Sequence, residues 1–262
     1  MIPLDQDFIL EIAPKFSGRN HERQRAIVAA LSGSFAQVLE SYRIDTALRI
    51  AHFMAQIAHE CAGFRTTEEF ASGAAYEGRA DLGNTEPGDG RRYKGRGLLQ
   101  LTGRFNYRDM GARLGIPLES EPERAAEPVL SLRIACEYWT RHDINALADR
   151  DDIVAVTRKV NGGLNGLEDR TRYLRRAKDA LARRAGLVLQ ARQAGTNPVL
   201  RRGSFGMAVI SLQERLVAKG AILTIDADFG GATESALMAF QRDHGLLPDG
   251  IAGEDTWAAL GA

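Results

Sequence analysis

Three glutamates that lie close together in the sequence could perform acid–base chemistry. Glu60 ends an apolar segment, Ala55-Gln56-Ile57-Ala58-His59-Glu60, and Glu68 and Glu69 follow in a polar stretch. A carboxyl group partly shielded from water at the end of an apolar helix favours its neutral form and can donate a proton. A second, ionised carboxylate nearby can accept a proton from water. Such a pair is suited to hydrolysis with a general acid and a general base.

Two further segments combine amide, hydroxyl and glycine residues. The run from Tyr93 to Tyr107, YKGRGLLQLTGRFNY, contains Gln100, Thr102 and Asn106, and Asn161-Gly162-Gly163 lies further on. Amide and hydroxyl side chains both donate and accept hydrogen bonds. The glycines more readily allow close approach of the backbone than bind anything themselves.

Helical periodicity dominates the part of the chain that must position these residues. One amphipathic helix is expected over residues 21–42, and Asp45 can cap a second that runs to Cys61. Residues 63–97 break the pattern with eight glycines, which predicts a long irregular stretch. Further helices are expected near 104–114, 129–142, 150–160 and 167–185. The fold class is therefore mainly α.

The C-terminal part of the chain reads as a separate unit. Residues 187–204 lose the helical period and contain Asn197-Pro198, so a linker is expected there. Three short helices are predicted beyond it, near 206–219, 232–244 and 254–260, and no clear internal repeat appears. From Gly203 onward, three basic and eight acidic residues give a charge of −5, which leaves +5 on residues 1–202 because the whole chain is neutral. A mildly basic first unit suits an anionic polymer, although most such units bind none.

The order of short motifs in residues 206–262 resembles the peptidoglycan-binding module found at the ends of many wall hydrolases. The matching words include Leu212-Gln213, Asp228-Phe229-Gly230, Phe240-Gln241, Asp249-Gly250 and Thr256-Trp257. This resemblance implies a small three-helix domain over residues 205–262. The aromatic and glycine residues of these motifs are expected to be structural, so the motifs do not identify the binding surface.

The motifs of the first part resemble glycoside hydrolase family 19, in particular its bacteriophage-endolysin branch. The resemblance covers about residues 40–185 and is carried by His59-Glu60, by the string from Gly95 to Tyr107, and by Asn161-Gly162-Gly163. It implies a lysozyme-like helical catalytic domain, to which we assign residues 1–186. It also implies cleavage of a glycosidic bond with inversion, which needs an acid and a base roughly 6.5–9.5 Å apart.

The resemblance assigns roles to individual residues. It makes Glu60 the general acid and, nine residues later, Glu69 the base; Glu68 remains an alternative, and Glu77 and Glu86 are looser ones. Phe70 stands where many relatives carry asparagine. Thr102 is expected to hold the attacking water. The residues expected to bind N-acetylated sugars are Gln100, Asn106, Asn161 and Arg170. Arg170 matches less well, because the charge-rich Asp169-Arg170-Thr171-Arg172 offers more than one register and better fits a solvated helix face. Tyr93 and Tyr107 could stack on sugar rings or serve as scaffold.

Other classes of enzyme fit the sequence poorly. A His-Glu metalloprotease motif needs a second histidine at position 63, which is glycine, and the five histidines show no zinc-ligand spacing. Gly95-Arg96-Gly97 lacks the third glycine of a dinucleotide loop. We therefore predict no cofactor, no metal and no nucleic acid among the partners.

The sequence thus predicts a lysozyme-like hydrolase of bacterial peptidoglycan, with a chitinase or a non-catalytic wall-binding protein as alternatives. A monomer without stable membrane insertion is expected, with Cys61 and Cys136 as buried, unpaired thiols. The first residues lack a recognisable signal peptide. On the endolysin resemblance, the protein would wait in the host cytoplasm and reach the wall through a holin-type pore.

Overall fold

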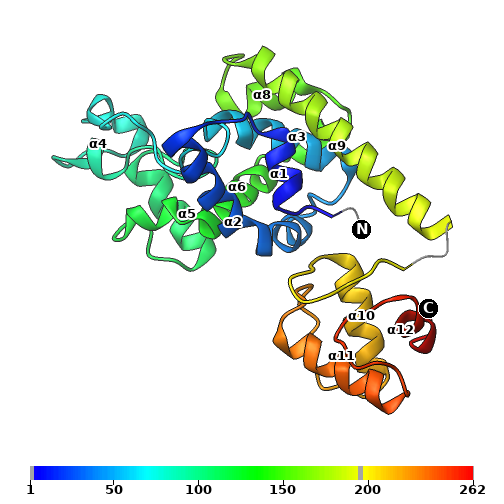
Figure 1. The fold of residues 1–262 in the computed structure, drawn as a ribbon. Helices are drawn as coiled ribbons and strands as arrows, with labels where there is room; N and C mark the ends of the chain where they lie inside the picture. Colours follow the sequence, from blue (N-terminus) through cyan, green and yellow to red (C-terminus); the bar gives the residue numbers. More distant parts are fainter. Residues whose placement is uncertain (1–2, 194–196, 262) are drawn as a thin grey trace. The chain divides into compact units, whose positions relative to one another are not determined.

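The computed structural model describes residues 3–193 and 197–261, which form two compact units (Figure 1). The larger unit comprises Asp5–Leu181 and the smaller one contains the residues from Ala182 onward. Both are helical, and the described residues contain only isolated β-bridges. The predicted mainly α class is confirmed. No helix within the described ranges is long and apolar enough to cross a membrane.

The larger unit contains eight α-helices, the first part of a ninth that continues past Leu181, and three short 3₁₀ turns within the described residues. In chain order they are α1 Gln6–Ile12, α2 Gly18–Ser41, α3 Ala47–Glu60, η1 Ala74–Tyr76, η2 Ala80–Leu82, α4 Asp89–Arg92, α5 Arg104–Leu114, η3 Pro122–Ala126, α6 Pro128–Arg141, α7 Ile144–Ala148, α8 Ile153–Asn161 and α9 Leu167–Gln193. Helix α2 packs along α6, and α3 packs against α7 and α8. The short helices α1 and α7 were not predicted from the sequence.

Helix α3 forms the centre of this unit and carries Glu60 at its end. All residues from Ile50 to Ala58 are buried, so the helix is enclosed on every side. Thr46, and not the expected Asp45, caps its start by accepting a hydrogen bond from the Arg49 backbone. Burial of polar residues in such a helix requires partners, which the neighbouring helices supply at the site.

The chain turns sharply directly after Glu60. Ala62, Gly63 and Phe64 all have positive φ, and a Cβ on Gly63 would lie 2.4 Å from the Pro14 ring. The Gln24 amide donates to the carbonyls of Pro14 and Gly63, at 2.9 and 2.7 Å. The turn is therefore fixed to the N-terminal segment.

The glycine-rich stretch after this turn is irregular, as expected, but it is well bonded. The Glu77 carboxylate accepts hydrogen bonds from the backbones of Gly88 and Gly90, at 2.6 and 2.9 Å. Buried Asn84 donates to the Tyr76 carbonyl and accepts from the Arg104 backbone. These side-chain bonds take the place of a regular hydrogen-bond ladder.

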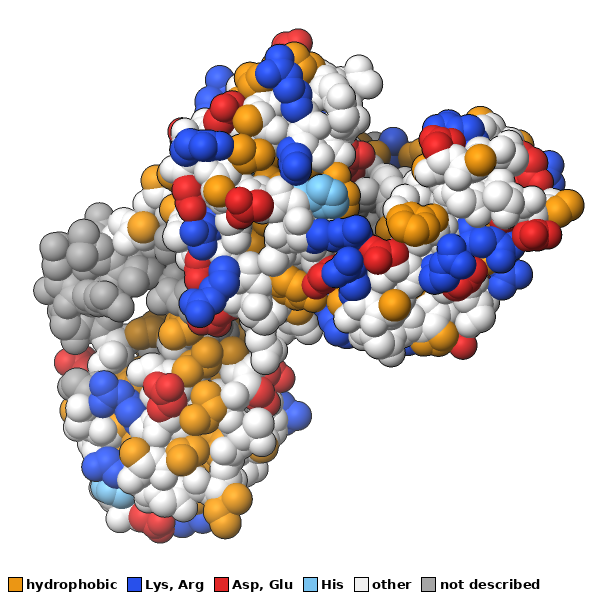
Figure 2. Space-filling view, turned by 180° about the vertical axis from the view of Figure 1, so that it is seen from behind, with side chains coloured by type: hydrophobic (Ala, Val, Ile, Leu, Met, Phe, Trp, Pro, Cys, Tyr) orange, Lys and Arg blue, Asp and Glu red, His pale blue; other side chains and the backbone are white. Residues whose placement is uncertain are grey.

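The smaller unit contains the three predicted helices, here α10 Met207–Ala218, α11 Gly231–Asp243 and α12 Glu254–Ala259. A single apolar core joins them, and it consists of Leu200, Val209, Leu212, Leu216, Phe229, Leu237, Phe240, Ala252, Trp257 and Leu260. Some apolar side chains also lie on the surface of this unit, as Figure 2 shows.

A buried glutamine closes each of the two turns between these helices. The Gln213 amide donates to Asp226 Oδ1, the Asp228 carbonyl and Thr233 Oγ1, at 2.7–3.0 Å. Its own oxygen accepts from the Asp226 and Ala227 backbones. We call this arrangement a glutamine clasp.

Gln241 forms a second glutamine clasp with the same parts. Its amide donates to Asp249 Oδ1, the Ile251 carbonyl and Thr256 Oγ1, at 2.9–3.1 Å, and its oxygen accepts from the Gly250 backbone. The unit therefore contains an internal repeat that the sequence analysis missed. The repeat is not visible in the sequence because the segment between the glutamine and its aspartate differs in length in the two copies.

The predicted linker over residues 187–204 differs from the structure at both ends. Helix α9 continues to Gln193, and residues 194–196 lie outside the described residues. At the other end, Leu200 pairs with Ala252 in the core, and the Trp257 indole donates to the Pro198 carbonyl at 2.8 Å. Residues from Pro198 onward thus belong to the smaller unit, because its core needs them to cover Trp257.

Candidate active site

Glu60 is held in place by an arginine from the far end of the larger unit's sequence. Nη2 of Arg170, on α9, lies 2.5 Å from Glu60 Oε1, and Nη1 donates to Gln56 Oε1 at 2.6 Å. The Arg170 side chain is fully buried and that of Glu60 is 18% exposed. Since Oε1 accepts from Arg170, Oε2 is the oxygen on which a transferable proton would sit.

Side chains from helices α6 and α8 also contribute to the surroundings of Glu60. Gln56, one turn earlier on α3, donates to Thr157 Oγ1 on α8 at 3.4 Å and so links three helices through Arg170. Tyr138 on α6 lies near enough for the Glu60 charge to add to the effect of burial, which raises the pKa of this tyrosine. The carboxyl is therefore held by side chains from several helices of the larger unit.

The residue before Glu60 fixes the loop that carries Asn161. His59 Nδ1 lies 2.8 Å from Asp169 Oδ2, and a Cβ on Gly166 would overlap the His59 ring at 2.2 Å. Gly166 has positive φ, so the loop can pass over the ring only with glycine there. Asn161 ends α8 at the start of this loop and is exposed.

Glu69 lies on a short piece of paired backbone with the string from Gly95 to Thr102. Its backbone N–H donates to the Gly95 carbonyl at 2.9 Å, and Oε1 accepts from the Gly95 N–H at 2.7 Å. The other carboxylate oxygen accepts from the Tyr76 hydroxyl at 3.0 Å. Burial raises the pKa of Tyr76, and its bond to Glu69 acts in the same direction, so the phenol stays a donor.

Glycine at position 95 allows three predicted site residues to meet. A Cβ added there would lie 2.8 Å from Gln100 Oε1, 3.3 Å from the Glu69 carboxyl carbon and 3.3 Å from Thr102 Oγ1. The Thr102 hydroxyl donates to the Gln100 carbonyl at 2.9 Å, so its lone pairs remain to accept from a water molecule. Asn106, in the first turn of α5, donates to the Thr102 carbonyl at 2.7 Å and fixes its backbone.

Glu68 faces a different set of groups from Glu69. Its Oε1 lies 2.9 Å from Arg96 Nε and 3.3 Å from Lys94 Nζ, and the side chain is 43% exposed. The backbones of Glu68 and Arg96 pair as an antiparallel bridge. Successive side chains of an extended strand point to opposite faces. Glu68 therefore pairs its half-exposed carboxylate with the buried Arg96, and Glu69 faces Thr102.

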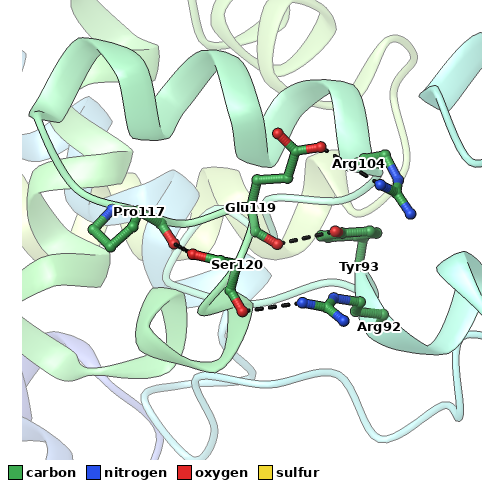
Figure 3. Close-up of a pocket in the computed structure, with 6 residues that line it drawn as sticks. All are labelled: Arg92, Tyr93, Arg104, Pro117, Glu119 and Ser120. Carbon is green, nitrogen blue, oxygen red and sulfur yellow. Dashed lines mark hydrogen bonds and ion pairs between the residues drawn. The ribbon is translucent and has the colours of Figure 1, made fainter.

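Tyr93 does not lie where a sugar-stacking residue must lie. Its side chain is 1% exposed, packs on Tyr107 with ring centroids 5.4 Å apart, and donates to the Glu119 carbonyl at 2.9 Å. Figure 3 shows it between Arg92 and Arg104, at the wall of a cavity of about 420 Å³ that includes none of the predicted catalytic residues. The expectation that Tyr93 binds sugar is therefore wrong, because its ring is part of the core.

Tyr107 is also scaffold, since it is fully buried. Its hydroxyl donates to the Lys94 carbonyl at 2.7 Å and accepts from Arg96 at 3.2 Å. Burial raises the pKa of Tyr107 to about 12. The two buried tyrosines thus form part of the core on which the Gly95–Thr102 segment packs.

The site residues fall into two groups on the larger unit. Glu60, Gln56 and Arg170 form one group on α3 and α9, and Glu69, Gln100 and Thr102 form the other. Figure 2 shows a hollow between the part of this unit that carries α8 and the part that carries α4. In the residues that the structure describes, no group of three or more His, Cys, Asp or Glu is placed to hold a metal ion.

Sequence reasoning underestimated Arg170, which it weighed as part of a solvated helix face. A usable signal is the helical period, because Arg170 precedes the buried positions Tyr173, Leu174 and Ala177 by three, four and seven residues. Arginine on the apolar face of a helix needs a buried acceptor, and Glu60 provides one.

Each of the two units matches a known family model. The family model for Chitinase class I matches residues 14–159, more than half of the chain. This chain belongs to that family, glycoside hydrolase family 19. The family model of a peptidoglycan binding domain matches residues 206–260.

Individual relatives match the family 19 part. A glycosyl hydrolase family 19 domain-containing protein of Haemophilus influenzae is 37% identical over 107 residues, which are 41% of this chain and 52% of the relative. An endochitinase of Arabidopsis thaliana is 34% identical over 145 residues, 55% of this chain and 48% of the relative. The chain thus spans about half of the length of these curated relatives.

Solved structures share the fold of the larger unit. A class IV chitinase of family 19 from Zea mays has a TM-score of 0.52 at 20% identity, over 70% of this chain and 94% of that one. Chitinase C from Streptomyces griseus HUT6037 has a TM-score of 0.51 at 20% identity, over 69% and 77%. The lysozyme-like helical fold predicted from the motifs is confirmed.

Proposed function

We propose that this protein hydrolyses the glycan strands of bacterial peptidoglycan. The observation that carries the proposal is that one chain contains both a family 19 domain and a peptidoglycan binding domain. In the family 19 domain, Glu60 and Glu69 are each held by hydrogen bonds in separate surroundings. The smaller unit would keep the larger one at an insoluble substrate and so raise its effective concentration there.

The reaction proposed is a single displacement at the anomeric carbon. Glu69 accepts a proton from a water molecule whose oxygen attacks that carbon, and Thr102 accepts a hydrogen bond from the same water. The bond to the leaving oxygen breaks as Glu60 gives that oxygen its proton. Attack from the face opposite the leaving group inverts the configuration.

Substrate binding is proposed for the polar residues around these groups. Gln100 and Asn161 carry amides suited to hydroxyl and acetamido groups, and Asn106 acts mainly by holding Thr102. Arg170 is buried and bonded to Glu60, so we assign it to positioning the acid and not to contacting sugar.

The test is a digest of purified peptidoglycan sacculi, with new reducing ends identified by mass spectrometry. Glu60→Gln should lower the rate about 10²–10⁴-fold, the usual contribution of acid–base catalysis. Exposed Glu40→Gln is the matched control and should leave the rate unchanged. Absence of new reducing ends with the wild-type protein would refute the proposal.

Chitin is the second candidate substrate, because named relatives are endochitinases. Soluble chitin oligomers in the same assay decide between the two. Cleavage of oligomers without cleavage of sacculi would support a chitinase. An endolysin role, with access to the wall through a pore, is a further proposal, and lysis of cells by the protein added from outside or expressed with a holin would test it.

A further inference from the structure

An arginine on the segment that follows the proposed acid lies over two phenylalanine rings. The Arg65 guanidinium carbon lies 5.4 Å from the centroid of Phe16 and 5.3 Å from that of Phe70. Both distances are within the range of a cation–π interaction. We call these three residues the Phe16–Arg65–Phe70 stack.

The stack rests on a rigid support. Phe16 belongs to the N-terminal segment that Gln24 ties to the turn after α3, and Gly63 packs directly on Pro14 in this segment. The Arg65 backbone donates to the Cys61 carbonyl at 3.1 Å. The guanidinium is therefore held in one place before any ligand arrives, which lowers the entropic cost of binding.

The position of the stack relates it to the reaction. Arg65 and Phe70 lie on the segment that leads from the acid, Glu60, to the base, Glu69. Phe70 directly follows Glu69, so the two Cα atoms are about 3.8 Å apart. The Phe70 side chain is nevertheless 68% exposed. An apolar ring this exposed, one residue from the proposed base, is available to contact a substituent of a bound strand.

The charge of Arg65 is unpaired on the protein. Within the described residues it forms no ion pair, and its Nε is buried without a hydrogen-bond partner. Arg96 and Arg170, by contrast, each bind a glutamate. Stacking covers the faces of a guanidinium, and Nε is buried, so the two Nη groups form the edge that can give paired N–H bonds to a carboxylate.

We infer that the Phe16–Arg65–Phe70 stack binds a carboxylate of the stem peptide carried by the glycan. The inference rests on the proposed peptidoglycan hydrolase function and deepens it. Peptidoglycan strands bear short peptides with free carboxylates, whereas chitin has no carboxylate. The stack would select peptide-bearing strands, with Phe70 covering the apolar part of the peptide.

The experiment compares three forms of one substrate. These are sacculi with intact stem peptides, sacculi whose carboxylates have been amidated, and glycan strands from which an amidase has removed the peptides. The variants are Arg65→Gln and Phe70→Leu, with Arg113→Gln as the control, since it removes an exposed arginine with the same change of charge. New reducing ends give kcat/KM, and thermal unfolding verifies that each variant is folded.

Arg65→Gln should lower kcat/KM on intact sacculi about tenfold, as expected for loss of a charged hydrogen bond. On stripped strands the decrease should be below twofold. Amidation should lower the wild-type rate to that of Arg65→Gln and leave the variant's rate unaltered. Phe70→Leu should show a smaller loss with the same substrate dependence.

Equal losses on intact and stripped strands would overturn the inference, since a merely structural stack affects every substrate alike. The same holds if Arg65→Gln keeps the wild-type rate on intact sacculi. Failure of the wild-type protein to cleave any peptidoglycan form would refute the proposed function, and the stem-peptide site with it.

Discussion

Arg170 and Glu60 form a salt bridge of 2.5 Å between α9 and the end of α3, although 110 residues separate them. The pair fixes the orientation of the proposed acid and connects the helix that carries it to the last helix of the larger unit. We therefore expect the pair to affect both stability and catalysis.

Arg170→Gln should destabilise the larger unit by about 3–5 kcal/mol, because it leaves the partly buried Glu60 carboxylate without its partner. The corresponding transition temperature should fall by about 6 °C or more. Arg172→Gln is the matched control two residues away, where the side chain is 48% exposed and pairs with Asp169. It should cost no more than about 1 kcal/mol. Similar transition temperatures for the two variants would contradict the role given to Arg170.

The two adjacent glutamates of the base segment should differ strongly in their effect on rate. Glu69→Gln should lower kcat at least about 10²-fold, since the proton acceptor is lost. Glu68→Gln removes an ion pair with Arg96 but no proton acceptor of the reaction, and it should lower kcat less than about tenfold. Reducing-end assays on the same wall preparation provide both values. A larger loss in Glu68→Gln would reverse the assignment of the base.

A buried histidine should make the stability of the larger unit depend on pH. His52 is fully buried on α3 with Nε2 bonded to Asp151 at 2.8 Å, and burial lowers its pKa below the ordinary 6.5. The charged groups that face it are Asp151, Asp152 and Lys178.

Because the pKa of His52 is lower in the folded than in the unfolded protein, its contribution to stability is present above about pH 6.5 and is lost as pH falls toward the folded value. Chemical denaturation at pH 7.5 and pH 5 should show this decrease. In His52→Gln the decrease should be smaller, whereas exposed His21→Gln should behave like the wild type. An unchanged pH dependence in His52→Gln would assign the effect to other groups.

The glutamine clasps predict where the smaller unit is most sensitive to substitution. Gln213→Leu or Gln241→Leu leaves several buried polar groups unpaired and should cost about 2–4 kcal/mol. For a unit this small, such a loss should abolish binding in a wall pull-down. Glu214→Leu, at the exposed neighbouring position, should retain binding. Full binding by both glutamine variants would show that the clasps are dispensable.

The sequence predicted the helices well and the site only in part. Helix α5 matches its predicted range at both ends, because its apolar period is clear and glycines precede and follow it. Helix α7 was missed, since five residues are too few to show a period. The end of α9 was placed too early: the helix was predicted to end near residue 185, and it continues to Gln193.

At the site, local motifs indicated which residues matter but not what each one contacts. The meeting of Glu69, Gln100 and Thr102 depends on the missing side chain of Gly95, which no periodicity reveals. Tyr93 was misjudged because an aromatic residue in a polar string resembles a sugar platform until its burial is known. The pairing of Arg170 with Glu60 spans distant segments and required the fold.

The two glutamine clasps also make the fold of the smaller unit independent of redox conditions. Domains of about 60 residues often depend on disulfides, and both cysteines of this chain are buried, unpaired residues of the larger unit. Amide hydrogen bonds gain or lose no electrons. The unit that recognises the wall should therefore keep the same fold under reducing and oxidising conditions, without an oxidative maturation step.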